Sequence, residues 1–552
     1  MLEWMGKKKV VNHHNDVPFH VLERKYSFDA TGKHEKDNGS GNMIIHGDNL
    51  VALKSLLPRF EGRVKCIYID PPYNTGNECW VYNDNVNDPQ IKKWLGEVVG
   101  KEGEDFSRHD KWLCMMYPRL KLLQKLLAKD GAIFISIDDV EVANLRLLCD
   151  EIFGSGNHLG TFVWQKRYSP DVRRAISDAH EYVLCYGKDP DAFKRSRNLL
   201  PLTKAQTKQF SNPDHDPRGP WKANDFTAPG YRPNQMYEIT LPSGRVVTPP
   251  KGRCWRVTKE GFDRFVAENR MIYGTNGDGV PAVKRFLSEM PGMVPWTWLN
   301  CEDVGHSQEG NNQLAAILGK AVFNYPKPVR LIERFVRIAT EEDSIVLDSF
   351  AGSGTTAHAV LKLNHEDGGR RKFILVEMDD YAETITAERV RRVTTGYGSG
   401  KSAAEGTGGD FSFYELGPQL MVDGVLNEEV PTEKIREYVW YTETKGAGLF
   451  NSDKSEATLT LRKARNVSGA SDESELMNKR DDKYLLGVAF GVAYYFCYEK
   501  DKSMTLNRTL LKKIKTKAES YVVYADACTL SAEELEKLHI TFKKIPRDVT
   551  RF

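Results

Sequence analysis

The chain has 552 residues, a net charge of +2, 40% hydrophobic residues and 28% charged residues, which is the composition of a soluble protein with two or three domains. It contains no apolar run of membrane-spanning length and no secretory signal at its start, so we expect a cytoplasmic protein with no membrane partner. Nine cysteines lack any Cys-x-x-Cys or Cys/His metal spacing, which indicates reduced thiols and no metal site.

The first predicted strand along the chain is the apolar run 43–46, which is followed by Gly47 and Asp48. A helix through Leu57 comes next, and Asp48 is of a residue type that caps helix N-termini. The same position also places a carboxylate at the carboxyl end of a strand, where ligands bind in open α/β sheets. Both roles are therefore open to Asp48.

The most informative stretch is Asp70-Pro71-Pro72-Tyr73, which directly follows the apolar, β-branched run 64–69. A run of this kind that stops at a double proline indicates a buried strand with an abrupt end. It leaves a carboxylate and an aromatic ring at the ligand-binding edge of a sheet. These groups can accept a hydrogen bond from an amino group and stack on a flat ring, as chemistry on a nucleobase amine requires. A simple Pro-Pro turn is the alternative.

Residues 70–76, Asp-Pro-Pro-Tyr-Asn-Thr-Gly, resemble the catalytic motif of amino-group DNA methyltransferases, which methylate adenine N6 or cytosine N4. The resemblance implies that Asp70, Pro71, Pro72 and Tyr73 are the catalytic residues. By analogy with the family, an aspartate rather than a serine at position 70 favours adenine as the target.

Further predicted elements complete a sheet around this motif. The apolar spacing predicts a helix over 112–128, and the run 131–139 predicts a strand. The apolar runs 161–164 and 182–186 predict two more strands at the far side of the sheet.

The middle of the chain has a different character. From about residue 188 to 310 the strand–helix alternation fades, and Pro, Gly, Asn and aromatic residues become frequent. Over 161–320 the basic residues outnumber the acidic residues by six. Basic side chains interleaved with aromatic ones fit a module that contacts DNA, although any single arginine here is more simply a solvated surface charge.

A second motif follows this segment. The run 344–348 predicts a strand ending in Asp348, and a glycine-rich turn then leads into a helix. Such a turn exposes backbone amides at a helix start, where a negative group is favoured. The next strand, 372–377, ends in Glu377, near the spacing at which an acid meets a ribose in dinucleotide folds. The third glycine of the dinucleotide fingerprint is absent, which disfavours a nicotinamide or flavin site.

The spacing Asp348-x-Phe350-x-Gly352-x-Gly354 resembles the S-adenosylmethionine motif of methyltransferases, and the segment 323–328 resembles the family element that packs against the methionine end of this cofactor. The resemblance implies S-adenosyl-L-methionine as the cofactor. It implies as binding residues Asp48, Asn49, Phe323, Pro326, Lys327, Asp348, Phe350, Ala351, Gly352, Gly354, Thr355 and Glu377.

The order of the two motifs best distinguishes between classes of methyltransferase. The motif that resembles the catalytic one comes roughly 275 residues before the cofactor motif, which is more than a typical domain length. This order resembles the β group of amino-methyltransferases, a circular permutation of the shared fold, and argues against protein-glutamine methyltransferases. The resemblance implies an α/β, Rossmann-like methyltransferase fold with a mostly parallel seven-stranded sheet, an inserted target-recognition domain and a small α/β C-terminal domain.

We therefore expect five parts in chain order. They are an N-terminal extension (1–40), the catalytic half of the methyltransferase domain (41–187), a target-recognition insertion that binds DNA (188–315), the cofactor-binding half (316–415), and a C-terminal domain for dimerisation or partner docking (416–552).

The motifs, their order and the length together resemble the Mod subunits of type III restriction-modification systems. The resemblance implies a homodimer in a bacterial or phage-associated cytoplasm that methylates adenine N6 in double-stranded DNA after base flipping. It also implies a separate helicase-nuclease restriction subunit as a partner. The open alternatives are a cytosine-N4 methyltransferase, a solitary adenine methyltransferase, an RNA methyltransferase and a catalytically silent DNA-binding scaffold.

Overall fold

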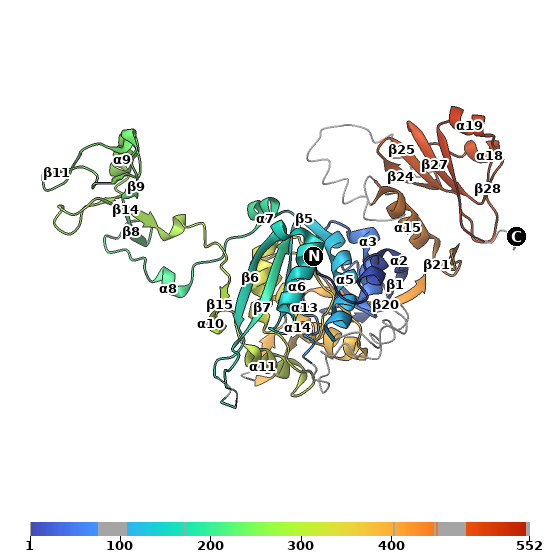
Figure 1. The fold of residues 1–552 in the computed structure, drawn as a ribbon, viewed down its shortest axis with the longest axis horizontal. Helices are drawn as coiled ribbons and strands as arrows, with labels where there is room; N and C mark the ends of the chain where they lie inside the picture. The colour runs from blue at the N-terminus through green and yellow to red at the C-terminus, as the bar shows by residue number, and fades with distance from the viewer. Residues whose placement is uncertain are drawn as a thin grey trace. The chain divides into compact units, whose positions relative to one another are not determined.

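An α/β sheet of eleven strands organises the larger of two compact units (Figure 1). The structure is a computed structural model, and it describes residues 2–75, 108–170, 172–173, 175–400, 403–445, 449–450 and 482–547. The larger unit comprises Met1–Asn198 and Trp296–Phe552, and the smaller unit comprises Leu199–Pro295. Within the described ranges, no helix has both the length and the apolar character needed to cross a membrane.

Neighbouring strands of the large sheet come from distant parts of the chain. The pairs β4–β5, β4–β16, β16–β17 and β17–β3 are parallel, whereas β7 is antiparallel to both of its neighbours. The predicted α/β class with a mostly parallel central sheet is therefore confirmed. In spatial order the strands are β15 (Trp298–Leu299), β6 (His158–Gln165), β7 (His180–Gly187), β5 (Leu127–Ile137), β4 (Val64–Ile69), β16 (Ile345–Asp348), β17 (Lys372–Glu377), β3 (Met43–His46), β20 (Asp410–Gln419), β1 (His20–Asp29) and β2 (Gly32–His34).

The sheet is wider than the seven strands predicted. The central strands from β6 to β3 make up seven, but β15 extends one edge, and β20, β1 and β2 extend the other. β20 pairs in parallel with β3, and β1 pairs antiparallel with β20, so the backbone groups along the edge of β3 are satisfied. The irregular burial along β1 explains why its sequence gave no clear strand period.

Helices cover both faces of the central sheet. Ile67 of β4 joins the hydrophobic core on one face, while the ring of Tyr68 stacks on Phe335 on the other, at a centroid distance of 6.0 Å. The alternation follows from the strand period of two. One face is covered by α3 (Asn49–Phe60), α5 (Arg108–Leu126) and α6 (Val142–Cys149), and the other by α12 (Val329–Ala339) and α13 (Thr355–Asp367).

The smaller unit has a hydrophobic core of its own. Its members are all buried large side chains, namely Phe226, Ile239, Leu241, Trp255 and Phe262. The unit lies inside the range 188–315 that the sequence analysis assigned to a target-recognition insertion. Its elements are β8 (Trp221–Asp225), β9 (Thr227–Pro229), β10 (Ile239–Thr240), β11 (Val246–Val247), β12 (Arg253–Trp255), α9 (Lys259–Ala267), β13 (Met271–Ile272) and β14 (Ala282–Phe286).

The C-terminal part of the larger unit forms a second, five-stranded sheet. Its buried residues fall into two clusters, one against α15 and one on the opposite side of β25. The Tyr441 hydroxyl of α15 donates a hydrogen bond to Glu61 after α3, which links this part to the eleven-stranded sheet and its helices. Its main elements are α15 (Thr432–Thr444), β23 (Leu449–Phe450), β24 (Leu485–Ala489), β25 (Val492–Phe496), β27 (Ser520–Ala525), α19 (Ala532–Lys537) and β29 (Ile540–Lys544).

Phe335 provides a test of how α12 holds the sheet. Its buried ring lies 4.7 Å from that of Phe134 and 5.4 Å from that of Phe162, measured between centroids. We expect Phe335→Ala to lower the free energy of unfolding by about 3–5 kcal/mol, because it opens a cavity in a close-packed layer. Urea denaturation followed by circular dichroism measures the loss. Phe335→Leu keeps most of the volume and should cost clearly less, and equal losses in the two variants would contradict this account.

Candidate active site

Acidic and polar residues meet at one edge of the sheet, because the strands before them run parallel. Val346 pairs with Cys66, Asp348 with Leu375, and Glu377 with His46, so the carboxyl ends of β4, β16, β17 and β3 lie side by side. Asp70 and Asp348 are therefore neighbours, although they are 278 residues apart in the chain. The two sequence motifs therefore lie at one edge of the sheet, the edge at which ligands bind in open α/β folds.

Asp70 follows β4 directly and is held by two side chains. Lys327 Nζ lies 2.9 Å from its Oδ1 and 2.8 Å from its Oδ2, and the Tyr73 hydroxyl donates to Oδ1 at 2.8 Å. The Lys327 ammonium also lies 2.8 Å from Tyr73 Oη and 4.9 Å from the centre of the tyrosine ring. Lys327, which was expected to bind the cofactor, thus has its ammonium on the Asp-Pro-Pro-Tyr motif.

A second carboxylate, Glu181 at the start of β7, lies beside this pair. Its Oε2 is 3.1 Å from Tyr73 Oη and 3.4 Å from Lys327 Nζ, and Lys166 Nζ lies 3.3 Å from its Oε1. Burial opposes the ionisation of Glu181, yet Lys327 and Lys166 hold its pKa below the usual value. Burial likewise opposes the charge of Lys327, but Asp70 and Glu181 raise the pKa of this lysine. Both Glu181 and Lys327 are therefore ionised at neutral pH.

Neither Glu181 nor Lys166 was predicted from the sequence as a site residue. Neither belongs to a motif, and Glu181 stands at the amino end of a strand rather than at the carboxyl end. One signal was available, since an antiparallel strand places its first residues at the same edge as the last residues of its parallel neighbours. The β7 strand is antiparallel to β5, which brings Glu181 to the edge where Asp70 lies.

Buried hydrogen bonds with Trp112 and Glu141 fix the loop that follows Asp70. The Trp112 indole donates to the carbonyl of Pro72 at 2.7 Å, and the Asn74 amide donates to Glu141 Oε1 at 2.5 Å. Asn74 is buried with a positive φ of 60°, a conformation that Asn tolerates better than most residues. Gly76, the last residue of the motif, lies outside the described residues.

The glycine-rich turn after β16 is shaped by a buried acid. Asp348 accepts hydrogen bonds from the Phe350 amide at 3.0 Å and from the Thr356 hydroxyl at 2.5 Å, and burial raises its pKa to about 7. Gly352 has a φ of +50°, and a Cβ there would lie 3.2 Å from the ring of Phe323. The turn therefore needs glycine at position 352, both for its backbone conformation and for the space above it.

Glu377 lies under this turn at the end of β17. Its Oε2 accepts the Gly352 amide at 2.6 Å, and its Oε1 accepts the Met378 and Asp379 amides at 3.0 and 3.2 Å. Burial, with the nearby charge of Asp379, raises its pKa to about 8 despite these donors. The carboxylate is thus fixed by the backbone.

Asp48 and Asn49 complete the edge beside Glu377. Asp48 caps α3 by accepting the Leu50 amide at 2.7 Å, and its Oδ1 lies 3.5 Å from a guanidinium nitrogen of Arg119. Asn49 donates to the carbonyl of Ser349 at 2.8 Å and accepts from Arg119 at 2.5 Å. The cap predicted for Asp48 is confirmed, and Asn49, at the start of α3, links the end of β3 to the turn that follows β16.

A buried arginine supports the turn from the other side. Arg389 of α14 (Glu388–Thr395) donates to the hydroxyls of Ser353 at 2.9 Å and Thr355 at 2.8 Å. Burial lowers its pKa to about 9. The helical pattern around position 389 predicts an ordinary helix face, so the sequence alone gave no sign of this contact.

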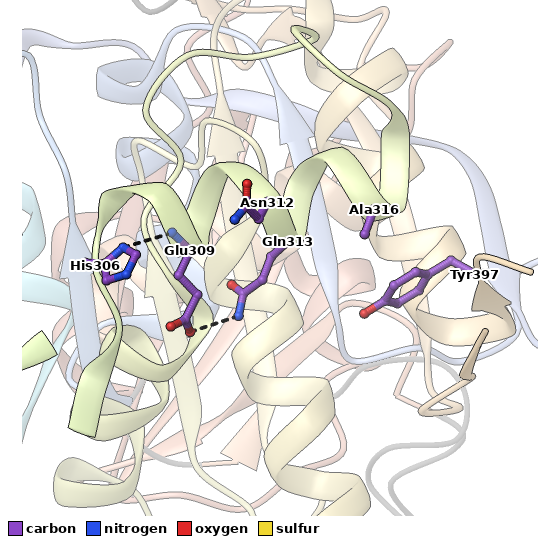
Figure 2. Close-up of a pocket in the computed structure, with 6 residues that line it drawn as sticks. All are labelled: His306, Glu309, Asn312, Gln313, Ala316 and Tyr397. Atoms are coloured by element: carbon purple, nitrogen blue, oxygen red, sulfur yellow. Dashed lines mark hydrogen bonds between the residues drawn. The ribbon is translucent and has the colours of Figure 1, made fainter. Parts of the chain in front are cut away.

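A separate surface pocket of about 490 Å³ lies along α11 (Ser307–Leu318). Figure 2 shows the His306 ring accepting the Glu309 backbone amide at 3.2 Å and the Gln313 side chain donating to the Glu309 carboxylate at 3.2 Å. Glu309 is also bound by Arg330. None of the site residues predicted from the sequence lines this pocket.

Comparisons with known proteins agree with this geometry. A family model described as DNA methylase, for N6 and N4 methyltransferases, matches residues 64–388. The Mod subunit of the type III restriction-modification enzyme StyLTI from Salmonella typhimurium is 36% identical over 367 residues, which cover 62% of this chain and 53% of that protein. The EcoPI Mod subunit from Escherichia phage P1 is 32% identical over 422 residues, which cover 69% and 63%. The type II methyltransferase M.KpnI from Klebsiella pneumoniae is 32% identical over 370 residues, which cover 62% and 81%. The chain thus spans between about half and two thirds of the length of the two Mod subunits.

Proposed function

The chain belongs to the DNA methylase family, and from this premise we propose that it transfers a methyl group from S-adenosylmethionine to adenine N6 of a base flipped out of double-stranded DNA. The observation that carries the proposal is that Asp70 and the glycine-rich turn at Gly352 lie at the same edge of the sheet and are joined by contacts of one residue. Lys327 connects the two, since its ammonium binds Asp70 and its carbonyl lies 3.4 Å from the Thr355 hydroxyl.

The residues after β16 and β17 fit the nucleoside and amino-acid parts of S-adenosylmethionine. The Glu377 carboxylate, fixed by the Gly352 amide, suits a ribose, whose two hydroxyls are donors. Asp48 and Asn49 suit the adenine end, and Phe323 and Pro326 suit the methionine end. Phe350, Ala351, Gly354 and Asp348 shape the turn. When bound, the cofactor supplies an electrophilic methyl group on its sulfonium.

The catalytic motif fits the amino group of a base. We assign one hydrogen-bond acceptor to Asp70 and the other to the carbonyl of Pro71, because the carbonyl of Pro72 already accepts from Trp112. Two acceptors hold the amino nitrogen with its lone pair directed away from the ring plane, and the negative charge of Asp70 favours the ammonium that develops there. Flipping the base costs a few kcal/mol, and stacking on Tyr73 offsets roughly 1–3 kcal/mol of this.

Two regions suit duplex DNA. The smaller unit, residues 199–295, carries fourteen basic and nine acidic side chains, and we assign it to target recognition. The hairpin that joins β6 to β7 starts at Lys166, beside Glu181, and bears three apolar side chains that are almost fully exposed: Tyr168 at 76%, Val172 at 93% and Ile176 at 89%. Apolar wedges of this kind separate or replace bases in bent and opened duplexes.

We further propose that the protein is a cytoplasmic Mod-type subunit, a homodimer that gives sequence recognition to a restriction subunit with helicase and nuclease activity. The similarity to the StyLTI and EcoPI Mod subunits supports this. The similarity to M.KpnI, which is named a type II methyltransferase, keeps open the alternative that the chain is not a type III Mod subunit, and a solitary adenine methyltransferase is one form of that alternative. Co-purification with a restriction subunit separates the two. A cytosine-N4 enzyme is the second candidate for the target base.

Asp70→Ala tests the reaction itself. We expect methyl transfer to DNA to fall by at least about 100-fold, because a preorganised acceptor at the reacting nitrogen is lost. Transfer of a labelled methyl group measures the rate, and mass analysis of the digested DNA identifies N6-methyladenine or N4-methylcytosine. The control is cofactor binding by calorimetry, which should stay unchanged since Asp70 is outside the glycine-rich turn. Undiminished transfer in Asp70→Ala would refute the mechanism.

Glu377→Gln tests the cofactor half. An ionised Glu377 accepts from ribose hydroxyls better than a protonated one, and its pKa is about 8 in the protein. Cofactor affinity should therefore rise as the pH increases from 6 to 8 and level off above that range. Glu377→Gln should weaken binding by about tenfold or more and remove this part of the pH dependence. Calorimetric titration of both proteins with S-adenosylmethionine across this pH range measures the cofactor affinity. The pH dependence that remains in Glu377→Gln is that of the ligand itself, and the difference between the two proteins is the contribution of Glu377.

The hairpin is tested by replacing Tyr168, Val172 and Ile176 together with alanine. Loss of the wedge should slow methylation of duplex DNA by about tenfold while leaving single-stranded DNA of the same sequence little affected, because only the duplex must be opened. Phe490→Ala removes another exposed apolar side chain, 80% exposed in the C-terminal part, and serves as the matched control. Equal slowing on both substrates would argue against the wedge.

A further inference from the structure

Both oxygens of the catalytic carboxylate are already occupied by groups of the protein. Lys327 Nζ lies within 2.9 Å of each Asp70 oxygen, and the Tyr73 hydroxyl donates to Oδ1 at 2.8 Å. A target amino group that donates to Asp70 must take one of these positions. Asp70 can accept from the target amino group only if the Lys327 ammonium and the Tyr73 hydroxyl have another acceptor within reach.

Glu181 offers that acceptor. A single oxygen, Oε2, lies 3.4 Å from Lys327 Nζ and 3.1 Å from Tyr73 Oη, so both occupants of Asp70 already touch it. The other oxygen is anchored by Lys166, whose ammonium also lies 3.6 Å from Asp178. A small shift of Lys327 toward Glu181 therefore exchanges one carboxylate partner for another without leaving the ammonium unpaired.

We propose that Glu181 is a positioning residue that takes over Lys327 and the Tyr73 hydroxyl from Asp70 when the target amino group arrives. This inference rests on the proposed function, because it concerns the acceptor used in that reaction. The exchange makes Asp70 selective for a group that can replace an ammonium, namely an amino group that donates hydrogen bonds and gains positive charge as it reacts.

The charges of Lys327, Asp70 and Glu181 favour a lysine that moves from Asp70 to Glu181 over a lysine that stays paired with Asp70. A lysine left on Asp70 would compete with the amino group for its oxygens and would oppose the positive charge that develops on the nitrogen. Glu181 balances that lysine at a distance from the reacting atom. The side chains of Lys327 and Glu181 are both only 11% exposed, so a partner lost by either one would leave a poorly solvated charge.

The test measures preference for the amino group by binding, so it needs no turnover. The target base is first located by mapping the methylated sites in DNA from cells that express the protein. The duplexes then carry either this base or its analogue without the exocyclic amino group, and S-adenosylhomocysteine is present. We expect the parent protein to prefer the amino-bearing duplex by about tenfold or more, as for a hydrogen bond to a charged acceptor. Glu181→Gln should reduce this preference to about threefold or less, because Lys327 then stays on Asp70.

The double variant Glu181→Gln/Lys327→Met distinguishes exchange from a structural role. With the lysine gone, Asp70 is no longer blocked, so the preference for the amino group should return to near the parent value. Glu437→Gln, which breaks a half-buried 3.2 Å pair with Lys434 on α15 and a 3.5 Å pair with Arg59, is the matched control and should leave the preference unchanged. If Glu181→Gln folds poorly, Lys166→Met removes the anchor of Glu181 and should give the same loss in weaker form.

Two results would overturn the inference while leaving the proposed function standing. One is a parent-like preference in Glu181→Gln in a protein that methylates DNA. The other is a loss in Glu181→Gln that persists unchanged in the Lys327→Met background, since a purely structural glutamate would act in both. Absence of methyl transfer by the parent protein is a different outcome, and it refutes the proposed function and the inference together.

Discussion

The parallel register of four strands is the constraint on which the rest of the site depends. Because β4, β16, β17 and β3 run side by side in one direction, the residues that follow them are brought to a single edge. Asp70, Asp348, Glu377 and Asp48 therefore gather there without any of them lying close in sequence. A change of direction in one of these strands would move its acid to the opposite edge and divide the site.

The parallel strands that form this edge were among the elements predicted accurately from the sequence. Strands buried on both faces are continuous apolar runs, so 64–69 and 372–377 were predicted with the bounds that β4 (Val64–Ile69) and β17 (Lys372–Glu377) have in the structure. An acid or a Pro-Pro pair directly after such a run marks its end. The motif resemblance then supplied the chemistry, which no periodicity could have given.

What the sequence did not predict depends on contacts between distant segments. Glu181 reaches the edge only because β7 runs antiparallel to β5, and nothing local distinguishes it from a solvated glutamate. Trp112 and Arg389 lie on helices whose apolar patterns are ordinary, yet one fixes the Pro72 carbonyl and the other the hydroxyls of the glycine-rich turn. The added strands β1 and β20 were missed for a related reason, since their half-buried residues carry no strict period.

The two halves of the edge, one around Glu377 and one around Asp70, differ in whether their buried acids are paired with lysines. This difference matches the ligands that we propose for them. In the cofactor half, burial raises the pKa of Asp348 to about 7 and that of Glu377 to about 8, so this half gains from a ligand with donors and positive charge. In the base half, Lys327 and Lys166 keep the pKa of Glu181 low, so this half is neutralised before any ligand arrives. A sulfonium donor suits the first half. A neutral amino group, which becomes positive only as it reacts, suits the second half once Lys327 has moved to Glu181.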